Sequence, residues 1–166
     1  MKKTFTLIYT LAAAFYSFTQ TIDIDQPKTY LPDFANTIKI GMGLKDFQGI
    51  KDTAQLERDI SYSYLYTGFI ETAINSPARK VTYKFDTPQN GKNNYRPLYE
   101  ISFEFNDPAF ADAYVNEKFT SYHRISEFAE KEWFLATNKD YWILIRKNQN
   151  FVTIAAMMSG TEWGFE

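Results

Sequence analysis

The chain has 166 residues, a length typical of a single domain that can bury a substantial core. It contains no cysteine, which excludes disulfide bonds, thiol catalysis and the cysteine anchor of a lipoprotein. Its formal net charge is −2 and it has no concentrated basic patch, which argues against a nucleic-acid partner.

The first twenty residues have the layout of a secretory signal peptide. Lys2 and Lys3 form a basic start, an uncharged apolar run follows, and small polar residues come next. The apolar run is shorter than the roughly 20 residues that a membrane-spanning helix needs, although an uncleaved anchor is the rival reading. Cleavage near Thr19 or Gln20 leaves a mature chain with a net charge of about −4. The sequence thus predicts an exported protein, periplasmic or secreted, with no membrane span in the mature chain.

Residues 21–36 are polar, include two prolines and show no helical period. We expect an extended lead-in, with disorder up to about Tyr30 as the alternative. The remaining residues, 37–166, are predicted to form one α+β domain.

The stretch "IKIGMGLKDFQGI" (residues 38–50) places Gly41 and Gly43 between a short apolar run and a predicted helix over 44–50. A dinucleotide fingerprint needs a third glycine three residues later and a parallel strand–helix unit, and neither is present. We therefore interpret the glycines as a turn and predict no phosphate or cofactor site. A second short helix is expected over 54–59.

Residues 60–67 alternate in character, which favours a strand that places Tyr62, Tyr64 and Tyr66 in one row; Gly68 is expected to break the chain after them. Three readings of the tyrosine row stay open. It lines the core face of the sheet, it belongs to a protein interface, or it forms a platform for sugar rings.

Residues 80–86 and 99–106 also alternate between apolar and polar side chains, as half-buried antiparallel strands do. A long polar hairpin loop joins them, with Asn90–Gly91 as its tight turn. Loops on a rigid sheet often carry function, so the loop contributes the candidate binding residues Asn90, Lys92, Tyr95 and Arg96.

Asp107 and Pro108 form the start signal of a helix that should run to about Thr120. Its predicted apolar stripe contains Phe110, Tyr114, Val115 and Phe119.

The last third of the chain holds three apolar runs, residues 132–137, 140–147 and 150–159, joined by short polar turns. In the middle run Trp142 and Leu144 point one way and the isoleucines point the other. Strands that are apolar on both faces are expected in the middle of a sheet, covered on both sides.

The glycine–methionine turn within "IKIGMGLKDFQGI" resembles the one that opens a helix in small exported outer-membrane assembly lipoproteins and β-lactamase-inhibitor-like domains. It is closer in style to uncharacterised exported proteins of the Bacteroidota. The resemblance covers about a dozen residues and implies a non-catalytic, protein-binding α+β domain. The chain differs from the lipoproteins because it has no anchoring cysteine, and from the inhibitors because it has no disulfides.

Catalytic readings receive less support. His123 is the only histidine, so a zinc site of several nitrogen or sulfur ligands is not available, and no metal is predicted. Glu127, Glu130 and Glu132 could serve as paired carboxylates of a hydrolase, but the run reads as a solvated face. Trp163 ends a Ser-Gly-x-x-aromatic string similar to a loop of periplasmic lysozyme inhibitors; the preferred reading is that Trp163 folds back onto the domain.

The sequence predicts an α+β fold, with one antiparallel sheet of about five to six strands and one to three helices packed on one face. The predicted function is that of an exported, non-enzymatic binding domain for a protein partner. The alternatives are a glycan-binding module that uses exposed tyrosine and tryptophan platforms and, less favoured, a carboxylate-dependent hydrolase.

Overall fold

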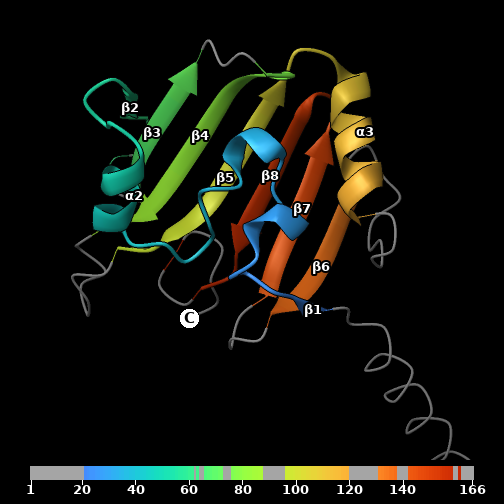
Figure 1. Cartoon of the computed structure of the whole chain (residues 1–166), viewed down its shortest axis with the longest axis horizontal. Helices are drawn as coiled ribbons and strands as arrows, with labels where there is room; N and C mark the ends of the chain where they lie inside the picture. The colour runs from blue at the N-terminus through green and yellow to red at the C-terminus, as the bar shows by residue number, and fades with distance from the viewer. Residues whose placement is uncertain are drawn as a thin grey trace, which may run out of the picture.

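The chain folds into one large sheet with its helices packed on a single face, as the computed structural model in Figure 1 shows. The structure describes residues 21–61, 63, 66–72, 76–87, 96–119, 131–137 (backbone only), 142–158 and 161. The predicted leader, residues 1–20, lies outside these ranges. Within them, no helix is both long and apolar enough to cross a membrane.

Within the described residues, the sheet has eight strands in the order β1-β6-β7-β8-β5-β4-β3-β2. Every neighbouring pair is antiparallel except β1 and β6, which run parallel over two positions. The α+β fold and its antiparallel sheet confirm the prediction: six strands have six residues or more, and the two short strands lie at the edges. The strands are β1 (Thr21–Ile22), β2 (Glu57–Asp59), β3 (Tyr66–Thr72), β4 (Ala78–Asp86), β5 (Leu98–Phe105), β6 (Lys131–Thr137), β7 (Trp142–Asn148) and β8 (Phe151–Ala156).

The first α-helix, α2 (Leu44–Ile50), has the predicted bounds. Gly43 stands at its N-cap, and Gly41 has φ 81°, a left-handed conformation that favours glycine. The two glycines therefore act as the predicted turn. Phe47 is fully buried and packs against the rings of Phe69, Tyr83 and Phe85 on the sheet.

The second α-helix, α3 (Pro108–Phe119), begins where its sequence signals predicted. The Asp107 carboxylate accepts a 2.7 Å hydrogen bond from the Ala109 N–H, as an N-cap residue does. The predicted apolar stripe is wrong at Phe110, which is 48% exposed, whereas Ala111 is buried. Ala111 lies three residues before Tyr114 and four before Val115, so it shares their face from both spacings.

The segment predicted as a lead-in is part of the domain core. It forms β1 and two 3₁₀ helices, η1 (Pro27–Thr29) and η2 (Asp33–Ala35). Ile22 and Tyr30 are each 1% exposed and belong to the same apolar cluster as the sheet. The disordered alternative is therefore wrong for this segment, because alternating isoleucines and one tyrosine bury enough apolar surface to fix a stretch that is polar on average.

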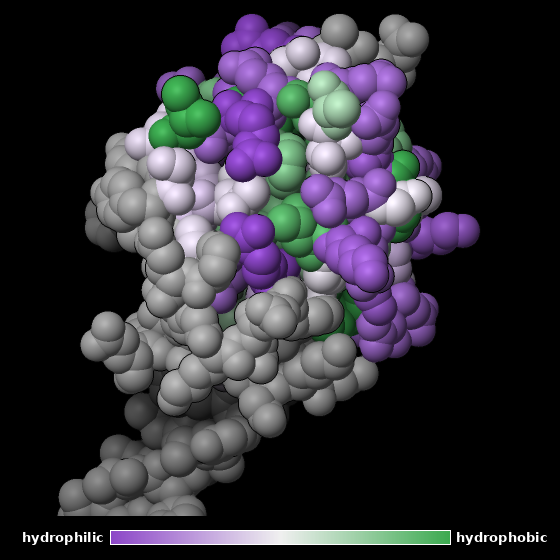
Figure 2. Space-filling view, turned by 90° about the vertical axis from the view of Figure 1, so that its left-hand side faces the viewer, coloured by the Kyte–Doolittle hydropathy of each residue, from purple (hydrophilic) through white to green (hydrophobic). Residues whose placement is uncertain are grey.

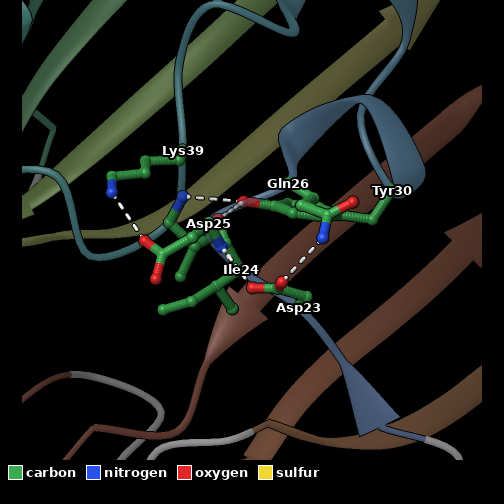
Figure 3. Close-up of polar contacts among 7 residues, drawn as sticks. Asp23, Ile24, Asp25, Gln26, Tyr30 and Lys39 are labelled. Atoms are coloured by element: carbon green, nitrogen blue, oxygen red, sulfur yellow. Dashed lines mark hydrogen bonds and ion pairs between the residues drawn. The ribbon is translucent and has the colours of Figure 1, made fainter.

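The Tyr30 hydroxyl is the polar centre of this segment, as Figure 3 shows. It donates a 3.1 Å hydrogen bond to the Ile24 carbonyl and accepts one of 3.2 Å from the Ile40 N–H. The Tyr114 hydroxyl donates to the Tyr30 carbonyl over 2.5 Å, which ties α3 to the segment. An exposed ion pair between Lys39 and Asp25 lies beside this centre, with 2.6 Å between its atoms.

Two predictions near β2 are wrong. The helix expected over 54–59 is a turn followed by β2, because the Asp52 carboxylate accepts a hydrogen bond from the Ala54 N–H and closes the chain locally. The strand expected over 60–67 is wrong at the described residues Ile60, Ser61 and Ser63, since Asp59 accepts a 3.0 Å bond from the Ser61 N–H and turns the chain after β2; Tyr66 belongs to β3.

The remaining strands lie where they were predicted, but the expected cover on both faces is wrong for the last runs, because Trp142 is 42% exposed and Phe151 is 46% exposed. The predicted strands over 80–86 and 99–106 are β4 and β5, which pair antiparallel, and the three last runs are β6, β7 and β8. Their alternate residues build the core beneath the helices; on the four central strands these are Val81, Tyr83, Phe85, Ile101, Phe103, Phe105, Ile143, Ile145, Val152 and Ile154.

The Tyr30 centre generates a first prediction. Tyr30→Phe leaves a buried carbonyl and a buried N–H without their partner, so we expect the free energy of unfolding to fall by about 1–3 kcal/mol. Urea denaturation measures this change. Lys39→Ala removes the exposed ion pair with Asp25 in the same segment and should cost less than about 1 kcal/mol. Equal losses from the two variants would contradict the assigned role of Tyr30.

Candidate functional site

The face of the sheet opposite the helices is the candidate site, and we call it the helix-free face. Strand alternation places every second residue of five strands on it. Its described members are Tyr66, Gly68, Ile70 and Thr72 of β3; Lys80, Thr82, Lys84 and Asp86 of β4; Glu100, Ser102 and Glu104 of β5; Trp142, Leu144, Arg146 and Asn148 of β7; and Phe151, Thr153 and Ala155 of β8.

A line of linked polar side chains crosses this face from the edge strand towards the middle of the sheet. It begins on β2, where the Asp59 carboxylate accepts a 2.8 Å hydrogen bond from the Tyr66 hydroxyl. The Lys84 ammonium lies 4.6 Å from the centre of the Tyr66 ring, a cation–π distance. The same ammonium pairs with Glu100 of β5 at 3.1 Å.

The line continues through hydroxyl groups to the next strand. Ser102 donates a 3.0 Å hydrogen bond to Glu100, and its oxygen lies 2.9 Å from the Thr153 hydroxyl of β8. The six residues Asp59, Tyr66, Lys84, Glu100, Ser102 and Thr153 are called the transverse row below. Glu100 is buried, and a buried carboxylate is tolerated when a cation and a hydrogen-bond donor both satisfy it, as Lys84 and Ser102 do here.

Gly68 explains why the transverse row reaches the edge strand. It stands opposite Asp59 on one side and Lys84 on the other. A Cβ atom on Gly68 would lie 2.6 Å from the Asp59 Cβ and 2.9 Å from Cε2 of the Tyr66 ring. Because glycine has no Cβ, the Tyr66 ring can lie over this position and join its two neighbours. Gly68 lies within β3, so the prediction that it breaks the chain is wrong.

The Asp59 carboxyl group is held in its charged form. Burial acts to raise its pKa, but hydrogen bonds from Tyr66 and from Ser61, together with the positive charge of Lys84, outweigh burial and lower the pKa below its ordinary value. The edge end of the transverse row therefore keeps its negative charge at neutral pH.

A second polar cluster lies on the helix side and joins α2 to the sheet. Lys51, which follows α2, contacts both oxygens of Glu71 at 2.8 and 2.9 Å, and the Tyr83 hydroxyl donates to Glu71 at 2.7 Å. Burial, the hydrogen bond to Glu71 and the charge of Glu71 all raise the pKa of Tyr83. The hydroxyl thus stays protonated as a donor, which suits a structural tie.

The predicted site residues have mixed outcomes. Tyr66 is 3% exposed and Lys84 covers its ring, so it offers no open platform to a sugar. Arg96 is half-buried at the base of the β4–β5 hairpin; it donates to the Thr67 hydroxyl at 2.8 Å and to the Asp86 carbonyl at 3.4 Å, and its φ is 23°. The candidates outside the described residues are Tyr62, Tyr64, Asn90, Lys92, Tyr95, Trp163, His123, Glu127 and Glu130.

Two exposed aromatic residues of the helix-free face were not among the predicted site residues. Trp142 is 42% exposed and Phe151 is 46% exposed. Phe151 pairs with Asn148, six residues along β7 from Trp142, so the two aromatics lie about 20 Å apart along the hairpin. Alternation placed Trp142 on the face away from the core isoleucines, but periodicity alone does not say which face helices cover.

The comparisons with known proteins add no identity. A scan against protein-family models, a search of curated proteins and a search of solved structures each return no match. In the part of the chain that the structure describes, no group of three or more histidine, aspartate or glutamate side chains is arranged to hold a metal ion. The resemblance of the glycine–methionine turn to exported binding domains stays a prediction.

Gly68 generates a second prediction. Gly68→Ala introduces a methyl group against Asp59 and the Tyr66 ring, and we expect it to lower the free energy of unfolding by about 1–3 kcal/mol, as overpacking does. Gly49→Ala is the matched control, since apart from its chain neighbours and the backbone of its own helix no heavy atom lies within 4 Å of the added Cβ, and α2 gains about 0.5–1 kcal/mol from alanine. Chemical denaturation measures the free energy of unfolding of both variants. A result in which Gly49→Ala is destabilised and Gly68→Ala is not would contradict the role of Gly68.

A third prediction concerns acid. The folded-state pKa of Asp59 is lowered, so its contribution to stability is present above the unfolded-state pKa and is lost as the pH falls through the folded-state value. The stability advantage of the wild type over Asp59→Asn should therefore shrink below about pH 4. Tyr66→Phe removes the largest pKa-lowering contact, so it should move this loss to higher pH. Denaturation midpoints between pH 7 and pH 2 test both expectations, and parallel profiles for all three proteins would contradict them.

Proposed function

We propose that this chain is an exported, non-enzymatic binding domain that recognises a protein partner in the periplasm or outside the cell. The export part of the proposal rests on the leader that the sequence predicts. The binding part is supported by the helix-free face.

The observation that carries the proposal is the combination of exposed aromatics with polar groups that are already fixed. Trp142 and Phe151 are exposed on the same face that the transverse row crosses. Aromatic side chains are enriched at protein interfaces because they supply a large contact area. Groups that are ordered before binding lose little conformational entropy when the partner arrives, so less binding energy is spent on ordering them.

The spacing of the aromatics favours a protein over a sugar chain. About 20 Å between Trp142 and Phe151 fits within one standard interface, which buries roughly 800 Å² on each partner. The glycan alternative relied on the tyrosine row, and the described member of that row, Tyr66, is covered. Glycan binding is therefore the alternative that the test distinguishes from protein binding.

The test, our fourth prediction, uses the mature chain from Gln20 onward to capture material from the host envelope and the culture supernatant. Proteins are identified by mass spectrometry and glycans by sugar analysis. We expect an enriched protein whose dissociation constant rises at least about tenfold for the double variant Trp142→Ser/Phe151→Ser. Phe110→Ser is the control, because Phe110 is exposed to a similar extent but lies on α3, in the helix layer.

Two results would contradict parts of this proposal. Enrichment of polysaccharide without protein would replace it with the glycan-binding module. A captured protein that binds the double variant and the wild type equally would leave the binding function in place but remove the helix-free face as its site. Thermal unfolding of each variant shows whether it remains folded at the assay temperature.

A further inference from the structure

The two edges of the sheet are built in different ways. At the β1 edge, Ile22 is buried in the core cluster, and Tyr30 fixes the chain that follows it. At the β2 edge, Glu57 and Arg58 are exposed and Asp59 is half-exposed. Figure 2 faces this second edge, where hydrophilic residues run along the surface and hydrophobic ones stand in small groups between them.

Surface contacts hold β2 in place. It pairs with β3 at three positions, Glu57 with Ile70, Arg58 with Phe69 and Asp59 with Gly68. Beyond this ladder, β2 is held by the hydrogen bond from Tyr66 to Asp59, by the positive charge of Lys84 near Asp59 and by a cation–π contact of Arg58 with the Phe69 ring at 5.2 Å. Segments that bury little apolar surface open locally at a lower free energy than the rest of the domain. Strand β2 should therefore detach while β4 and β5, whose alternate residues are buried, stay paired.

Detachment of β2 uncovers an edge of β3 with defined chemistry. A strand edge accepts another extended chain through its backbone N–H and carbonyl groups. At the position that Asp59 occupies, the Tyr66 hydroxyl can donate to an incoming carboxylate, and Lys84 lies on the same ring. Gly68 permits the close approach of the incoming backbone. At the position of Arg58, an incoming side chain would lie on the Phe69 ring.

We propose that β2 is a detachable edge strand, and that an extended acidic segment of the protein partner takes its place on β3. The identity of the occupant as a protein segment rests on the proposed function. Its chemistry follows from the contacts that β2 itself makes: a carboxylate for Tyr66, preceded by an apolar or cationic residue that covers Phe69. The site lies next to the helix-free face, because Tyr66 and Lys84 belong to both.

Hydrogen exchange of the free protein, our fifth prediction, tests the opening of β2. Backbone amides of β2 should exchange at least about 100-fold faster than those of β4 and β5 in the same molecule. Exchange of β2 as slow as that of β4 would overturn the proposal.

A locked variant tests strand replacement. Glu57 and Ile70 stand opposite each other and the chain has no cysteine, so Glu57→Cys/Ile70→Cys offers a single disulfide across β2 and β3. The probe is a fluorescein-labelled peptide with the sequence of residues 53–61, "TAQLERDIS", followed by fluorescence anisotropy. The wild type and the reduced variant should bind it, and the oxidised variant should bind at least about tenfold more weakly. A peptide with alanine in place of Asp59 should also bind the wild type at least about tenfold more weakly.

The outcomes separate this proposal from the proposed function. Equal binding of the probe to the oxidised and reduced variants would overturn strand replacement. A captured partner that binds the oxidised variant as tightly as the wild type would also overturn it and would leave the protein-binding function in place. Absence of any captured protein would count against the proposed function, whereas the exchange and peptide measurements would still decide whether β2 detaches.

Discussion

The alternation of side chains along the strands is the constraint on which this structure depends. In a chain without cysteine, the core alone must hold the domain, so one face of each central strand has to be apolar and covered. Phe47 of α2 and Tyr114 of α3 each pack against several aromatic rings of that face. Each large side chain buried in this way contributes about 1.5–3 kcal/mol to folding. The helices are therefore confined to one layer.

The second face is organised by electrostatics. Glu100 is buried there, and its carboxylate is satisfied by Lys84 and Ser102. Members of such a network polarise and strengthen one another in a low-dielectric setting. Asp59 lies at one end and Thr153 at the other, so the line of contacts extends from the edge strand β2 to β8 in the middle of the sheet. The two proposed binding regions therefore adjoin each other through the transverse row.

The sequence predicted elements where local signals and tertiary packing agree. Helices α2 and α3 carry their own start signals, and strands β4 to β8 show alternating or continuous apolar runs. The failures occur where tertiary contacts decide. Residues 21–36 look polar but bury Tyr30, and the turn after Asp52 replaces an expected helix. For the candidate site, alternation grouped the residues of one face, but the topology decides which face remains without helices, so the exposure of Trp142 was not predictable.

Gly68 links the fold to the site more closely than any aromatic residue does. In the sequence it looked like a break, because glycine is unfavourable in strand interiors. In the structure the Tyr66 ring occupies part of the space that a side chain at this position would need. The Tyr66 hydroxyl donates a hydrogen bond to the charged Asp59 of β2. A larger residue would collide with Asp59 and with the Tyr66 ring at the edge end of the transverse row. A glycine inside an otherwise alternating strand is therefore a signal for close approach by another chain segment, here β2 and, in our proposal, the partner that replaces it.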